Sequence, residues 1–228
     1  MAMHWYARPK GDKHQLRVAP ALDSWNKADD AGQVRLQAFV DDTEALVAAT
    51  RVDGPWALRL DVGLPAEENL LHQKDLDNYA LRLAFRLQDA DLVSVWCTKR
   101  HSEHSFVRIE SAREVPPPRE GVLIAEPTAS YARPDHLYHQ QIQAAAAGAA
   151  QLPAGRPVRL ELAFVVGPAW NWLNLWKPTI DALVPLLGHS GSRRTWDPLD
   201  GRIIELGMHL TVDKAARHVV IGIAAAPE

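Results

Sequence analysis

Asp75 and Asp77 lie one residue apart in the segment KDLDNYALRLAF, residues 74–85. In extended backbone, residues two positions apart point the same way, so both carboxylates could face one site while Leu76 packs inward. Two such charges repel each other unless a cation or a proton relieves them. Carboxylate oxygens suit Mg²⁺, which activates water and stabilises charge on phosphate. Asp89, just before the next apolar run, is the expected third ligand.

A structural interpretation of the same residues stays open. Asp77 or Asn78 would then cap the helix that follows the motif, because short polar side chains accept hydrogen bonds from the first amides of a helix. Asp89 would then lie in a turn. The choice between these interpretations depends on the rest of the chain.

Apolar periodicity and turn residues predict the same order of elements twice. Each half contains a helix, a strand, a helical motif segment, and two strands that are expected to form a hairpin. In the first half these segments are 34–50, 56–64, 74–85, 92–97 and 106–111. In the second half they are 132–150, 158–166, 170–188, 202–210 and 218–225.

This self-similarity predicts an α+β fold built from two copies of one unit. The proline-rich segment 116–120 separates residues 1–115 from residues 116–228. Two copies would pack around a pseudo-two-fold axis, as a dimer fused into one chain. Coincidence remains the alternative, because this order of elements is common.

The acidic segment resembles the motif of RusA-like Holliday junction resolvases, which are Mg²⁺-dependent nucleases that act as homodimers on branched DNA. Asp75, Asp77 and Asn78 match the family's two aspartates and asparagine, and Asp89 matches its third acid. The family's lysine falls on Leu81, with Arg82 one residue later. The spacing to the third acid is also shorter than is usual in the family.

The second half resembles the same motif with both acids replaced. In NWLNLWKPTIDAL (171–183), Asn171 and Leu173 occupy the two aspartate positions. The segment 196–206 resembles the one that carries the third acid. The residues that match the asparagine, the lysine, the helix signature and the third acid are Asn174, Lys177, Asp181 and Asp200.

The resemblance implies a Mg²⁺-dependent, structure-specific endodeoxyribonuclease that acts on branched DNA in repair or recombination. Its favoured site binds Mg²⁺ through Asp75, Asp77 and Asp89, with Lys74 or Arg82 at the phosphate. A composite site that includes Lys177, Asp181 or Asp200 requires the two motif regions to touch. The alternative function is an inactive resolvase-derived module that binds nucleic acid or a protein partner.

Composition limits the possible partners. The formal net charge is −3, whereas nucleic-acid binders usually present a basic face. The densest basic points would contact DNA, or else form solvated loops; their residues are Lys99, Arg100, Arg193 and Arg194. Because no apolar run approaches a membrane span and Cys97 is the only cysteine, we expect a cytoplasmic pseudo-dimer, with further oligomerisation left open.

Tryptophan is abundant, with eight residues, four of which are close together in the second half: Trp170, Trp172, Trp176 and Trp196. Large aromatic side chains most often fill a core or an interface, and we expect these four to pack between the two halves. The functional alternative is stacking on unpaired bases of a DNA junction.

Overall fold

The computed structural model describes residues 2–22, 31–50, 52–72 and 74–228. Its strands are β1 (Trp5–Tyr6), β2 (His14–Gln15), β3 (Trp56–Leu64), β4 (Leu92–His101), β5 (Phe106–Ser111), β6 (Glu114–Val115), β7 (Leu123–Ala125), β8 (Val158–Val166), β9 (Ile203–Val212) and β10 (Val220–Pro227). Its helices are α1 (Ala31–Val47), α2 (Leu76–Leu87), α3 (Leu137–Ala146), η1 (Trp172–Leu175), α4 (Trp176–Asp181), α5 (Val184–Leu187) and η2 (Asp200–Arg202).

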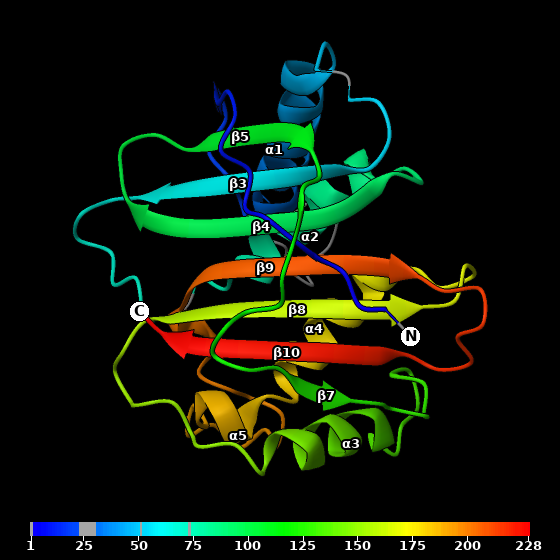
Figure 1. Cartoon of the computed structure of the whole chain (residues 1–228). Helices are drawn as coiled ribbons and strands as arrows, with labels where there is room; N and C mark the ends of the chain where they lie inside the picture. The colour runs from blue at the N-terminus through cyan, green and yellow to red at the C-terminus, as the bar shows by residue number, and fades with distance from the viewer. Residues whose placement is uncertain (1, 23–30, 51, 73) are drawn as a thin grey trace.

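One mixed sheet of eight strands runs through the molecule in the order β2-β5-β3-β4-β9-β8-β10-β7 (Figure 1). The pairs β3–β4 and β8–β9 are parallel, whereas β4 and β9 are antiparallel at the middle of the sheet. Parallel neighbours need a crossover. It is supplied by α2 between β3 and β4, and by the segment from η1 to η2 between β8 and β9. The expected α+β class is therefore confirmed.

The two predicted hairpins are wrong, although their strands form. β5 pairs with β3 rather than with β4, and β10 pairs with β8 rather than with β9. The short connection after β4 crosses the end of β3 at Gly63, where a Cβ atom would lie 2.4 Å from the carbonyl oxygen of His104. Sequence spacing alone predicts a tight turn between β4 and β5. Because Gly63 has no side chain, the connection can instead cross the end of β3, and β5 pairs with the other edge of β3.

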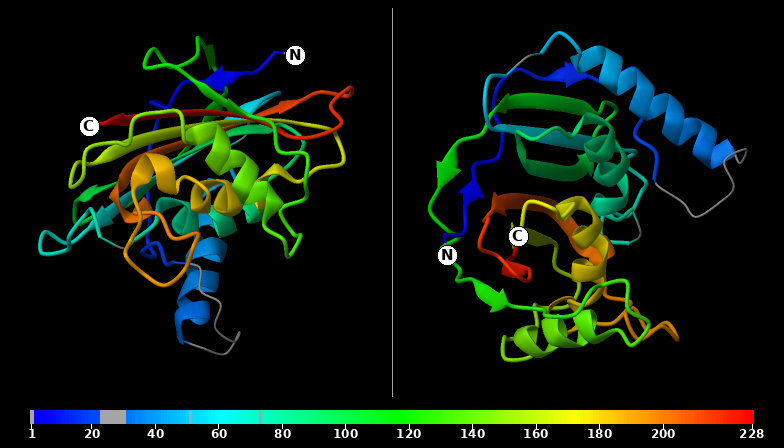
Figure 2. Two further views of the ribbon diagram at one scale, coloured as in Figure 1. Left: turned by 90° about the horizontal axis from the view of Figure 1, so that it is seen from below. Right: turned by 90° about the vertical axis from the view of Figure 1, so that its right-hand side faces the viewer.

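The helices gather on one face of the sheet, and the N-terminal segment crosses the other (Figure 2). α2 buries Leu76, Tyr79, Ala80, Leu83 and Ala84. Their spacing of three and four residues forms one apolar stripe. α1 packs against α2, and α3 and α5 pack against each other beside β7. The Trp-rich segment, expected as one helix, is broken into η1, α4 and α5.

The middle of the sheet is closely packed around one glycine. Trp96 of β4 pairs with Gly207 of β9, and a Cβ atom at Gly207 would lie 2.9 Å from the Trp96 indole. Trp5 of the N-terminal segment covers Ala163 and Ala224 on the second-half strands. The start of the chain therefore packs on the other half of the molecule.

None of the helices among the described residues is both long and apolar enough to serve as a membrane span.

Candidate functional site

The acidic motif lies at the start of α2, on the helical face of the sheet. Asp75 precedes the first turn, but its side chain makes no capping hydrogen bond. Instead Asp75 Oδ2 accepts a hydrogen bond of 3.2 Å from the Asn78 side-chain amide. Asp77 is only 2% exposed, and its Oδ2 has no hydrogen-bond partner. Helix capping therefore does not account for this pair of acids.

The corresponding residues of the second half lie on η1, α4 and η2. Asn171 caps η1 by accepting a hydrogen bond from the Leu173 amide. On α4, Lys177 Nζ lies 3.1 Å from Asp181 Oδ1, one helical turn away. Asp200 begins η2, directly before β9. Three predicted site residues of the second half therefore lie on the crossover segment between β8 and β9: Lys177, Asp181 and Asp200.

Lys99 joins the two motif regions. This buried side chain extends from β4 and donates hydrogen bonds to the Lys74 carbonyl oxygen at 3.0 Å and to the Gly201 carbonyl oxygen at 2.5 Å. Lys74 has a φ of 67°, a left-handed conformation that is uncommon for a residue with a side chain. The Lys99 ammonium group therefore connects the backbone before α2 to the backbone of η2 through these two hydrogen bonds.

The carboxylates of this region influence one another electrostatically. Burial raises the pKa of Asp77 to about 6, and the negative charges of Asp75 and Asp181 act in the same direction. Burial, followed by the charges of Asp75 and Asp77, raises the pKa of Asp200 to about 8. Burial also raises the pKa of Asp181. Like charges from both halves thus lie close enough to oppose each other's ionisation.

Two lysines offset part of this negative charge. Burial would lower the pKa of Lys177, but nearby carboxylates raise it above its usual value; the strongest of these interactions is with Asp77. Burial lowers the pKa of Lys99 to about 8, and the charge of Asp75 opposes this shift. We call the six residues the composite cluster: Asp75, Asp77, Lys99, Lys177, Asp181 and Asp200.

The expected third acid lies elsewhere. Asp89 follows α2, at the opposite end of this helix of 12 residues from Asp75. Its Oδ1 accepts hydrogen bonds from the Trp56 indole nitrogen at 2.8 Å and from the amides of Asp91 and Leu92. A helix of that length spans about 18 Å, so the structure does not bring Asp89 to Asp75 and Asp77. Its contacts are those of the turn residue in the structural interpretation.

The remaining candidates are basic residues. Lys74 Nζ lies 3.7 Å from Glu68 Oε1. Arg82 is exposed on α2. Arg100, Arg193 and Arg194 are also exposed, so contact with DNA stays a prediction for them. Lys99, by contrast, is only 3% exposed, which places it within the cluster rather than at a DNA-contacting surface.

The tryptophans divide into two environments. Trp172 and Trp176 are buried, with ring centroids 5.1 Å apart, and Trp172 lies near Phe164 of β8. They belong to the core beneath the second-half strands and present no surface to a base. Trp196 instead lies against His139, with ring centroids 5.2 Å apart.

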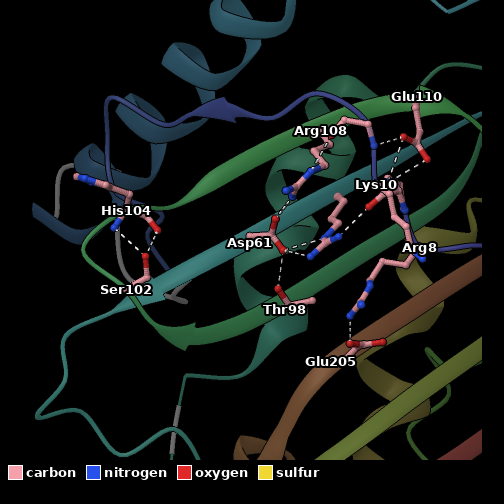
Figure 3. A network of polar contacts seen from close by, with 12 residues as sticks. Arg8, Lys10, Asp61, Thr98, Ser102, His104, Arg108, Glu110 and Glu205 are labelled. Atoms are coloured by element: carbon pink, nitrogen blue, oxygen red, sulfur yellow. Dashed lines mark hydrogen bonds and ion pairs between the residues drawn. The ribbon is translucent and has the colours of Figure 1, made fainter.

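A second charged network lies on the opposite face of the sheet and was missed in the sequence. Asp61 accepts a hydrogen bond of 2.7 Å from Thr98 and pairs with Arg108 (Figure 3). Burial would raise the pKa of Asp61, but Thr98, Arg59 and Arg108 hold it below its usual value. The alternation of polar residues along β3 is the only signal that could have indicated it. These charges satisfy one another and leave the composite cluster as the stronger candidate site.

The donors of the composite cluster suit a hard divalent cation in kind. They are carboxylate oxygens, and the unpartnered Oδ2 of buried Asp77 is a polar atom that a ligand would satisfy. Within the described ranges, however, no three His, Cys, Asp or Glu side chains are arranged closely enough to form a metal-binding group. The chemistry of the donors therefore fits Mg²⁺, but the carboxylates would have to move closer together to coordinate it.

Comparison with protein-family models, with curated proteins and with solved structures found no match.

Proposed function

We propose that this protein is a Mg²⁺-dependent, structure-specific endonuclease that hydrolyses DNA phosphodiesters at the composite cluster. The observation that supports this most strongly is that Lys99 donates hydrogen bonds to the carbonyl oxygens of Lys74 and Gly201, which are the chain neighbours of Asp75 and Asp200. Burial raises the pKa values of Asp77 and Asp200, and neighbouring negative charge raises them further, as is typical of a cluster whose charge a bound cation relieves. Apart from Lys99, the residues of the cluster are ones that match the resolvase motif, drawn from both halves rather than from the first half alone.

We also propose that the chain is a fused and diverged pair of resolvase-like units, corresponding to residues 1–115 and 116–228. The strand orders β5-β3-β4 and β10-β8-β9 are alike in direction. Both parallel pairs carry a register shift after their first residue, at Trp56 and at Val158. The pairing of β4 with β9 is centred on Trp96 and Gly207. These correspondences support a pseudo-two-fold axis at the middle of the sheet.

Within such a pair, each half supplies what the other lacks. Asp75 and Asp77 are the acids of the first half, and Asp200 is the third acid of the second. A bound Mg²⁺ would polarise the phosphate and lower the pKa of its water. Asn78 orients Asp75 through their hydrogen bond. Lys177 is placed to neutralise phosphate charge next to these acids.

The second candidate is an inactive resolvase-derived module that binds branched nucleic acid or a protein partner. One observation favours it: Lys177 already offsets the charge of Asp77, Asp181 and Asp200. In this case the Lys177 ammonium group takes the place of the metal, and the charged cluster stabilises the contact between the two halves.

A cleavage assay on a four-way DNA junction separates the two candidates. We expect the wild type to cut the junction in Mg²⁺ but not in EDTA, and Asp77→Asn to lose at least about 100-fold in rate, since the substitution removes a charge at the reacting centre. Binding of the junction in EDTA without cleavage in Mg²⁺ would support the inactive module. Cleavage that survives Asp77→Asn would contradict the proposed site.

A further inference from the structure

A pocket of about 500 Å³ opens between α2 and the η1–α4 segment, next to the composite cluster. Its volume lies within the range of about 300–1,000 Å³ that is usual for small-molecule sites. Leu81 and Phe85 line it from α2, and Leu173 and Pro178 line it from the second half. The pocket therefore spans the boundary between the two motif segments.

The lining combines aromatic surface with amides. Phe85 and Tyr131 contribute rings, and Asn78 and Asn174 contribute side-chain amides. Aromatic faces stack on nucleobases of any sequence, whereas amides offer a donor and an acceptor to base edges. A flat, polar-edged ring is the ligand that this combination suits.

The positively charged side chains at the rim of the pocket indicate that the ring of the ligand carries a negatively charged group. Lys177 and Arg82 both border the pocket, and Lys177 also belongs to the composite cluster. A phosphate attached to the ligand would therefore lie beside a cation at the point where the pocket meets the acids. Asp181 also borders the pocket, but its carboxylate is paired with Lys177 at 3.1 Å.

We infer that the pocket between α2 and α4 receives one unpaired nucleobase of the bound DNA, whose phosphate faces Lys177. This inference rests on the proposed function and adds to it the preferred substrate. The protein then selects DNA that offers an unstacked base, such as a junction with one unpaired nucleotide at its crossover. Extruding such a base from the stack costs little free energy, because it has no partner to lose.

The test measures binding in EDTA, where cleavage plays no part. The probes are two four-way junctions that differ only at one unpaired crossover nucleotide, which carries its base in one and is abasic in the other. We expect the wild type to bind the first about tenfold more tightly, which corresponds to about 1.4 kcal/mol. Phe85→Leu, which keeps an apolar side chain but removes the ring, should abolish this preference.

Phe106→Leu is the matched control, because Phe106 lies on β5 with Lys13 4.1 Å from its ring centroid, and it lines no wall of this pocket. It should keep the preference for the base. Asn174→Ala, at an exposed position of η1, tests the pocket a second time without removing core packing. Equal affinity of the wild type for the two junctions would overturn the inference, as would a preference that survives both Phe85→Leu and Asn174→Ala.

The failures of the two proposals are distinguishable. A base-dependent preference in EDTA, with no cleavage in Mg²⁺, would uphold the pocket and reject the nuclease. Cleavage that requires Asp77, with no dependence on the unpaired base, would reject the pocket alone.

Discussion

Lys177 exerts the strongest charge interaction felt by Asp77, although the two residues lie one hundred positions apart in the chain. Asp77 comes from the first turn of α2, and Lys177 comes from α4 in the other half of the sheet. Their proximity follows from the antiparallel pairing of β4 with β9, which places the two crossover segments side by side. The candidate site is therefore a property of the whole sheet.

Asp89 and Asp77 should respond differently to substitution. Replacing Asp89 with alanine removes the acceptor of hydrogen bonds from the Trp56 indole and from the amides of Asp91 and Leu92. We expect Asp89→Ala to lower the free energy of unfolding by about 1–3 kcal/mol. Urea denaturation measures this loss.

Junction cleavage by folded Asp89→Ala should match that of the wild type, whereas Asp77→Asn should be inactive. A loss of cleavage in Asp89→Ala at a temperature where the protein stays folded would show that Asp89 takes part in catalysis.

The raised pKa of Asp200 makes stability depend on pH. Its folded-state pKa of about 8 lies above the value of about 4 in an unfolded chain. Between these values the folded state binds the extra proton, so this contribution to stability is complete below about pH 4 and disappears as the pH rises through about 8. The free energy of unfolding of Asp200→Asn, relative to that of the wild type, should therefore be about 2 kcal/mol higher at pH 9 than at pH 6. This figure is conservative, because the nearby lysines screen the charge of Asp200.

Denaturation of both proteins at the two pH values measures this difference. Asp197→Asn is the control, because hydrogen bonds from Ser190 and Ser192 lower the pKa of Asp197, so it stays ionised throughout this range. A stability difference between Asp200→Asn and the wild type that does not change with pH would show that Asp200 is not held among the other carboxylates.

Lys99 should contribute to stability through its two backbone contacts. Lys99→Met keeps the apolar part of the side chain but leaves the carbonyls of Lys74 and Gly201 without this donor. We expect a loss of about 2–4 kcal/mol in the free energy of unfolding, since hydrogen bonds from a charged group are among the stronger ones. Lys214→Met, at an exposed turn position, should change the free energy of unfolding by less than about 0.5 kcal/mol. Equal effects of the two substitutions would mean that Lys99 does not join the motif regions.

Gly207 should tolerate no side chain. A Cβ atom there would lie 2.9 Å from the Trp96 indole, so Gly207→Ala forces the ring to move and should lower the free energy of unfolding by about 1–3 kcal/mol. Gly148→Ala is the control, because nothing lies within 4 Å of its added atom. The smaller ring in Trp96→Phe should relieve part of the loss, which a double-mutant comparison by thermal denaturation measures. A neutral Gly207→Ala would contradict the close approach of β4 and β9.

Strand positions could be predicted from this sequence, but strand pairing could not. The runs 56–64 and 158–166 match β3 and β8 residue for residue, because turn residues bound each run and apolar residues fill most of its positions. The hairpins failed because sequence spacing favours pairing with the next strand. Nothing in the spacing reveals that the chain crosses over Gly63 to the far side of β3.

The candidate site was predicted in part. The spacing of Asp75 and Asp77 indicates both of them, and the resemblance of the second half to the same motif indicates Lys177, Asp181 and Asp200. The position of Asp89 before a strand predicts it as the third acid, but α2 lies between it and the other acids, and the length of this helix separates them. The sequence predicts Lys99 at the surface, because it follows an apolar run in a basic turn. β4 continues to His101, so alternation turns Lys99 to the helical face.

If the two halves share one charged cluster, Asp77 and Lys177 must interact, and a double-mutant cycle between them measures that interaction directly. The free energies of unfolding of the wild type, Asp77→Asn, Lys177→Met and the double variant are measured by urea denaturation at pH 8, where Asp77, with its pKa of about 6, is ionised. We expect a coupling energy of at least about 1 kcal/mol, because the effects of substitutions within one electrostatic network are not additive. Effects that add to within about 0.3 kcal/mol would mean that Asp77 and Lys177 do not interact, and would contradict the composite site.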